Sequence, residues 1–141
     1  MRKYLTEFIG TFFLVLTIGC AVIGGATPAP LAIAAALMAM IFAGGHVSGA
    51  HYNPAVTLAI WLRGRCDTKD VVPYMIAQVL GACAAAAAVK VLVGSGKAAE
   101  IKNVPAALLA EFLFTFALAA IGYFSASLTW RTFWLRTRYD E

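Results

Sequence analysis

One short segment of the chain carries the residues with the clearest chemical potential. The small-residue loop Ser48–Tyr52 leads into Asn53-Pro54-Ala55, and an apolar run continues to Leu62. Asparagine is a favourable N-cap, and a proline in the first helical position has no N–H to leave unsatisfied. We therefore expect a helix to begin after Asn53. Its positive N-terminal end, with the two amide donors of Asn53, is suited to orienting a water oxygen and repelling a cation or a proton.

The residues around this segment are those of a membrane protein. Hydrophobic residues make up 62% of the 141 residues and charged residues 13%, and the mean hydropathy is +0.81. Soluble domains average about 45–50% apolar and about 25% charged residues. The net charge of +4 raises the question of nucleic acid, but the basic residues flank apolar stretches and form no stripe on a soluble face. The composition predicts a multispan all-α protein whose surroundings are the lipid bilayer, with no nucleic-acid partner.

The positions of the charged residues divide the chain into spans. No Asp, Glu, Lys or Arg occurs in the 55 residues from Phe8 to Leu62, and the windows Val71–Val89 and Phe112–Trp130 are also free of charge. A membrane-spanning helix needs about 20 apolar residues. Arg2-Lys3 before the first apolar run is compatible with a signal peptide, but Glu7 within that run favours a true span. The predicted spans are Leu5–Ile23, Leu31–Val47, Val72–Val93 and Ala106–Tyr123.

The segment Ser48–Leu62 is too short to cross a bilayer by itself. Irregular backbone at membrane depth is tolerated only where protein buries it or where it lines a watery cavity, because lipid offers no hydrogen bonds. We therefore predict a re-entrant loop and a half-helix between the second and third spans. A helix lying on the membrane surface is the alternative, and spacing alone favours neither.

Basic residues in the short loops predict the orientation of the chain. If the N-terminus is cytoplasmic, only Lys97 and Lys102 lie in an outer loop. The inner side then collects the other loop and terminal basic residues, which are Arg2, Lys3, Arg63, Arg65, Lys69, Arg131, Arg136 and Arg138. Loops rich in Lys and Arg face the cytoplasm. The N-terminus is therefore expected inside, and after four spans the C-terminus as well.

A weak internal repeat links the two ends of the sequence. Glu7–Phe12 reads EFIGTF and Glu111–Phe116 reads EFLFTF. The first copy enters the membrane from the inside and the second from the outside. Repeats of opposite orientation are typical of transport proteins.

Together these features resemble one family. The stretch Gly45–Thr57 closely resembles the first signature loop of the aquaporin family (major intrinsic proteins), and Glu7–Phe12 resembles that family's first helix. The resemblance covers residues 1–118, the first repeat and the start of a second, which is about half of a family member. Residues 119–141 end the fourth span and form a divergent basic and aromatic tail. That tail suits either a membrane interface or a shifted reading frame in a truncated gene.

The resemblance implies roles for particular residues. Asn53 would be the donor at the pore centre, with Pro54 and Ala55 completing the start of the half-helix. The carbonyls of Gly49, Ala50 and His51 would form a ladder of acceptors leading permeants to it.

It also implies two supporting acids and one filter position. Glu7, near His51, and Glu111 would be buried acids that brace the re-entrant loops. Ile33 occupies the filter position of the second span, where water-selective members usually have Phe and glycerol-conducting members Trp. Because Ile33 matches neither, the solute stays open between water and other small neutral molecules. A homotetramer in the cell membrane is implied as well.

Three functional interpretations follow. The first is channel-type transport of water or small uncharged solutes by a chain that is incomplete alone, because such a pore needs two half-helices. The second is a non-conducting subunit or remnant, and the third a proton-coupled exporter that uses Glu7. No nucleophile–base pair, phosphate loop or metal-ligand cluster is visible, so we expect no enzyme activity, catalytic residue, metal or cofactor.

Overall fold

The structure is a computed structural model that describes residues 1–96 and 102–139, with side chains described as far as Phe124. This part of the chain is all-helical, and each of the four predicted spans falls in a helix long and apolar enough to cross a membrane. The predicted fold class is therefore confirmed. The helices are α1 (Arg2–Ile23), α2 (Ala29–Ser48), α3 (Pro54–Leu62), α4 (Thr68–Val93) and α5 (Val104–Tyr139).

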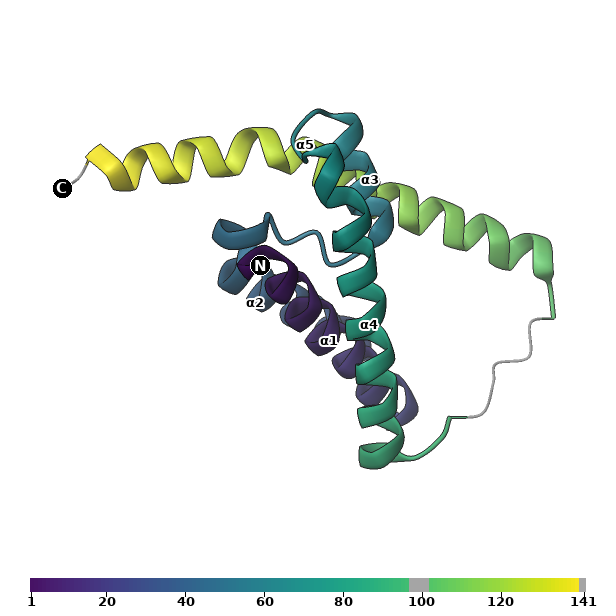
Figure 1. Ribbon diagram of the computed structural model, residues 1–141. Coiled ribbons are helices and arrows are strands. Elements are labelled where there is room, and N and C mark those ends of the chain that lie inside the picture. Colours follow the sequence, from purple (N-terminus) through teal and green to yellow (C-terminus); the bar gives the residue numbers. More distant parts are fainter. Residues whose placement is uncertain (97–101, 140–141) are drawn as a thin grey trace.

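The helix α1 is the centre of the packed region. It contacts α2 on one side and α4 on the other, while α3 contacts α4 and α5 (Figure 1). The helix α4 begins at Thr68, earlier than the predicted Val72, because Asp67 precedes it in extended conformation and its carbonyl accepts the N–H of Asp70. The charged first turn is thus part of the helix.

The short helix α3 follows an irregular connection from the end of α2. Gly49 ends α2 in the left-handed conformation, with φ of 89°, and Asn53 begins α3 in an extended conformation. The Asn53 side chain accepts a hydrogen bond from the Ala55 N–H, and Pro54 occupies the first helical position. The expected helix start at Asn53-Pro54 is confirmed.

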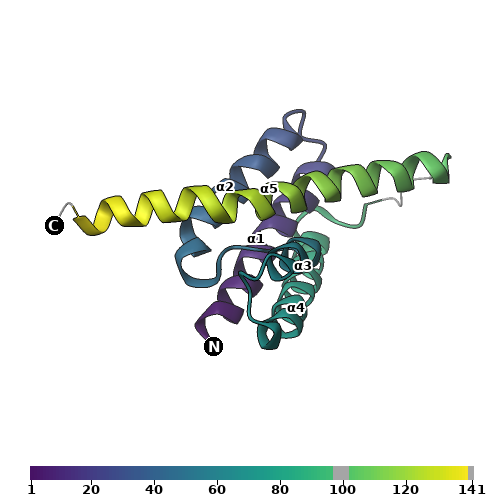
Figure 2. The same cartoon turned by 90° about the horizontal axis from the view of Figure 1, so that it is seen from above.

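The helix α5 differs most from the expectation for its region. The sequence predicts that residues 106–123 form a fourth span beside the others, followed by a tail. Instead α5 continues without a break to Tyr139 and lies across the other long helices (Figures 1 and 2). No proline follows Pro105, so nothing in the sequence stops the helix. Among the described helices α5 packs only on α3, so no other contact aligns it with α4.

The most deeply buried side chains are polar. Gln78, Glu7 and Thr57 are the largest fully buried side chains, whereas most large apolar residues are exposed. This inversion is expected when lipid surrounds the helices, since apolar side chains then face outward and polar groups need partners inside.

Candidate functional site

The carboxylate of Glu7, on α1, binds the re-entrant loop. Its Oε1 accepts hydrogen bonds from the Ser48 hydroxyl (2.7 Å) and the His51 backbone N–H (3.0 Å). Its Oε2 accepts from the Tyr52 backbone N–H (2.7 Å) and from Nε2 of Gln78 (2.8 Å). Hydrogen bonds to charged groups contribute about 1.5–3 kcal/mol each. Glu7 therefore satisfies two loop amides that have no helical partner.

These bonds keep the loop in an uncommon backbone conformation. Ala50 and Tyr52 both adopt positive φ, 53° and 49°, although neither is glycine. Such residues persist where their surroundings over-determine them, at a cost of about 1–3 kcal/mol each. The Ala50 N–H donates to the Ser48 hydroxyl (3.1 Å), and the Tyr52 N–H donates to Glu7. The loop is thus a rigid element rather than a simple connection.

Tyr52 anchors the loop between two helices. Its ring lies where a β-carbon at Gly10 of α1 would be, and its hydroxyl lies where one at Gly44 of α2 would be and donates to the Met40 carbonyl (2.8 Å). Only 3% of Tyr52 is exposed. Tyr52 received no role from the sequence, because the glycines on either side of it are far apart along the chain.

A second polar network joins the loop to α3 and α4. The Thr57 hydroxyl donates to the Asn53 carbonyl (3.1 Å) and accepts from Nε2 of Gln78 (2.9 Å). Nδ1 of His51 lies 3.2 Å from the same hydroxyl, whose proton is already directed to Asn53, so this nitrogen is best assigned as the donor. Thr57 and Gln78 were missed from sequence. A lone amide inside the charge-free window Val71–Val89 was the available signal.

The oxygen and the nitrogen of the Asn53 side chain have different hydrogen-bonding states. Its oxygen caps α3 by accepting the Ala55 N–H at 2.8 Å. Its amide nitrogen donates no hydrogen bond to the described residues. The capping bond therefore uses the oxygen of the side chain and leaves the nitrogen without a partner among the described residues.

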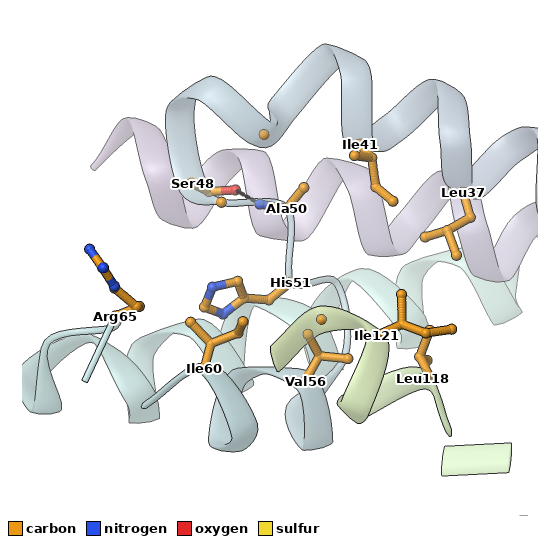
Figure 3. A pocket seen from close by; sticks show the side chains of 13 residues that line it. Leu37, Ile41, Ser48, Ala50, His51, Val56, Ile60, Arg65, Leu118 and Ile121 are labelled. Atoms are coloured by element: carbon orange, nitrogen blue, oxygen red, sulfur yellow. Dashed lines mark hydrogen bonds between the residues drawn. The ribbon is translucent and has the colours of Figure 1, made fainter. Parts of the chain in front are cut away.

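A cavity of about 420 Å³ lies between α2, α3 and α5, over the re-entrant loop (Figure 3). Arg65 lies at one end with Ser48 and His51 nearby, and Leu37 and Leu118 lie at the other. The wall is thus polar at the loop and apolar beyond it. Its lining residues are Leu37, Ile41, Gly45, Ser48, Gly49, Ala50, His51, Val56, Ile60, Arg65, Leu118, Ile121 and Gly122.

The structure brings some of the expected site residues to this cavity and leaves others outside it. Gly49, Ala50 and His51 line the cavity, and Asn53-Pro54-Ala55 begins α3 without lining it. Ile33 is half-buried on α2, one helical turn before Leu37 on the same face.

Glu7 and Glu111 differ sharply in their surroundings. Glu7 is fully buried beneath the loop, whereas Glu111 is exposed on α5 and has no hydrogen bond to the described residues. Because α5 contacts only α3 among the described helices, it holds Glu111 away from the re-entrant loop. The expected bracing role of Glu111 stays a prediction.

A smaller cavity of about 210 Å³ adjoins the larger one and shares Ser48, His51 and Arg65 with it. Its other lining residues are Cys66, Asp67, Asp70 and Tyr74. Tyr74 donates to the Ser48 carbonyl (2.8 Å), which fixes this wall to the loop. Burial raises the pKa of the Cys66 thiol, and the carboxylates of Asp70 and Asp67 raise it further.

An ionic cluster is centred on Asp70, one of the lining residues of the smaller cavity. Asp70 of α4 accepts hydrogen bonds from the Lys3 ammonium (2.5 Å) and the Tyr4 hydroxyl (2.7 Å) of α1. The Tyr4 ring packs edge-on against Tyr74. This cluster joins the first turns of α1 and α4 beside the re-entrant loop.

Long apolar helices packed around a buried loop and a half-helix are the architecture of a multi-pass membrane protein. The family model described as Major intrinsic protein matches residues 1–133. The chain belongs to the major intrinsic protein family.

Relatives from bacteria and plants agree with this assignment. The chain is 47% identical over 106 residues to Aquaporin Z of Rhodopseudomonas palustris, covering 69% of this chain and 44% of the relative. It is 44% identical over 99 residues to Glycerol uptake facilitator protein-like 6 of Lactiplantibacillus plantarum, covering 67% and 45%. It is 39% identical over 131 residues to Aquaporin NIP1-3 of Oryza sativa subsp. japonica, covering 83% and 46%. The chain thus spans about half the length of these curated relatives.

Proposed function

We propose that this chain forms one half of a channel for water or small uncharged solutes. The observation that carries the proposal is the buried loop held by Glu7, whose residues Gly49, Ala50 and His51 line the cavity. Rigid backbone at membrane depth offers carbonyl acceptors that lipid cannot replace. A path of fixed acceptors beside an apolar wall suits molecules that exchange hydrogen bonds without carrying charge.

The start of α3 supplies the donor side of this proposal. The Asn53 amide nitrogen is free for a solute while the Asn53 oxygen caps the helix. The helix end carries partial positive charge, which favours a solute oxygen and disfavours a cation. In aquaporin-type pores the positive ends of half-helices act as electrostatic barriers in the same way. No catalytic chemistry is needed, and we infer that the chain is not an enzyme.

The assembly and location extend the same proposal. A complete pore requires a second half-helix approaching from the opposite face, so a complementary half is the partner we propose. A homotetramer in the cell membrane with the N-terminus in the cytoplasm is the arrangement that the family and the loop charges support. Ile33 favours neither water nor glycerol, and the relatives include both proteins named aquaporin and a protein named glycerol uptake facilitator.

Stopped-flow swelling of proteoliposomes tests the proposal. The chain alone is expected to give little selective water flux. Co-reconstitution with the portion of the R. palustris relative that this chain does not match is expected to give flux with low activation energy. Flux from neither preparation would favour a non-conducting subunit. Proton movement under a pH gradient, without swelling, would favour the exporter.

Two substitutions separate the roles of Asn53 in the conducting preparation. Asn53→Asp keeps an N-cap oxygen but removes the amide donors, and Asn53→Leu removes both. We expect both variants to lose water flux, whereas only Asn53→Leu should also lower thermal stability, by about 1 kcal/mol. Unchanged flux in Asn53→Asp would contradict the donor role.

A further inference from the structure

The two cavities meet at three residues. Ser48, His51 and Arg65 line both the apolar cavity of about 420 Å³ and the polar cavity of about 210 Å³. A solute that moves between the two cavities across this shared wall passes these side chains. Figure 3 shows Arg65 at the loop end of the larger cavity and the apolar residues beyond His51.

The other basic side chains near this junction each have a partner. Lys3 forms an ion pair with Asp70 at 2.5 Å, and Lys69 forms one with Asp67 at 3.4 Å. The Arg63 guanidinium donates to the Tyr123 carbonyl and packs over the Tyr123 ring. Within the described residues Arg65 takes part in no ion pair. The Glu7 carboxylate, which contacts Ser48 and His51, lines neither cavity and accepts four hydrogen bonds. Among the residues that line both cavities, Arg65 is therefore the one with a fixed charge.

The larger cavity offers nothing to offset that charge. Of its lining residues, Arg65 is the one that carries a fixed charge, and no carboxylate lines it. Arginine stays protonated at every accessible pH. Low-dielectric walls focus the field of a charge into a cleft, so the potential at the junction acts on any ion that approaches.

From this charge pattern we infer that Arg65 is a specificity-determining residue, which disfavours cations at the junction and leaves neutral solutes unaffected. The inference rests on the proposed function for its meaning in transport, since a channel for uncharged solutes must reject ions. The charge asymmetry itself is a property of the junction whether or not the chain conducts.

Thiol labelling measures this asymmetry without any requirement for flux. Val56 lines the larger cavity only and is 7% exposed, so Val56→Cys in a chain with Cys20, Cys66 and Cys83 replaced by alanine reports on the charge selectivity of that cavity. The purified chain in a non-ionic detergent is treated with methanethiosulfonates of similar size, one cationic (trimethylammonium) and one anionic (sulfonate). The ratio of the two rate constants cancels the intrinsic reactivity of the thiol.

Arg65→Gln is expected to lower the anionic-to-cationic ratio at Val56→Cys by roughly threefold to tenfold, the scale expected for loss of one unit charge that water largely screens. Arg65→Lys, which keeps the charge, should hold the ratio within about twofold of its starting value. Raising the salt concentration to about 1 M should reduce the ratio in the parent chain and change Arg65→Gln little.

Arg63→Gln is the matched control. Arg63 lies two positions before Arg65 and carries the same charge, but its side chain lines neither cavity. The inference is overturned if Arg65→Gln leaves the ratio unchanged, or if Arg63→Gln lowers it equally. Failure of both reagents to label Val56→Cys also overturns it, since the larger cavity would then admit no solute of this size. Loss of the proposed function would appear separately, as absent water flux with a normal labelling ratio.

Discussion

The aromatic ring of Tyr52 occupies the space that a β-carbon at Gly10 would fill. The two residues belong to the re-entrant loop and the first helix, and the Tyr52 hydroxyl occupies the space of a β-carbon at Gly44 of α2. The absence of two side chains thus creates a slot for the Tyr52 ring. This slot holds the Tyr52 side chain, and the Glu7 carboxylate holds the backbone of His51 and Tyr52.

Gly10→Ala and Gly44→Ala are each expected to destabilise the protein, by about 1–3 kcal/mol, because the added methyl group overlaps the Tyr52 ring. Tyr52→Phe should relieve part of the Gly44→Ala defect, since that overlap involves the hydroxyl. It should not relieve Gly10→Ala, whose overlap is with ring carbons. Thermal unfolding in detergent measures the single variants and the double mutants. Equal rescue of both glycine variants would contradict this packing.

Glu7→Gln is expected to lower thermal stability strongly. Four donors converge on the Glu7 carboxylate, and an amide group in its place would direct its own N–H groups toward some of them. Each lost partner costs about 1–3 kcal/mol. Glu111→Gln is the matched control, because Glu111 is exposed and should tolerate the change. Unchanged stability in Glu7→Gln, together with loss of a measured proton flux, would support the exporter instead.

The depth of the loop can be tested with a large thiol reagent. Arg65→Cys and Val56→Cys, each in an otherwise cysteine-free chain, are treated with a maleimide attached to polyethylene glycol. Arg65 is exposed and Val56 is 7% exposed, so we expect fast labelling only at Arg65→Cys. Small reagents should still reach Val56→Cys through the cavity. Equal labelling by the large reagent would place the segment on the membrane surface.

Cys66 should react with iodoacetamide only at higher pH than an exposed cysteine. Burial disfavours the thiolate, and the carboxylates of Asp70 and Asp67 add to the effect, so the pKa of Cys66 is raised. The alkylation rate is therefore expected to rise with a midpoint above that of a free thiol. Asp70→Asn should move this midpoint downward. A midpoint at or below that of free cysteine would contradict the described surroundings of Cys66.

The sequence alone determined the elements and their chemistry. Charge-free windows of membrane length predicted the long helices, since an uncompensated charge is costly in lipid. Asn53-Pro54 predicted where the half-helix begins, because capping and proline placement are local effects that depend on adjacent residues. Glu7 stood out as an acid in an apolar run, and its proximity to His51 was expected from the family resemblance.

Only the tertiary structure decided which distant residues meet. Gln78 and Thr57 join the network around Glu7, and Gly10 meets Tyr52, because helices separated in sequence pack at one place. Arg65 gained its significance in the same way, since two cavities and the ion pairs of its neighbours define its surroundings. The direction of α5 also follows from packing. The length of its apolar stretch is sufficient to span a membrane, but that length carries no information about the angle at which α5 meets α3.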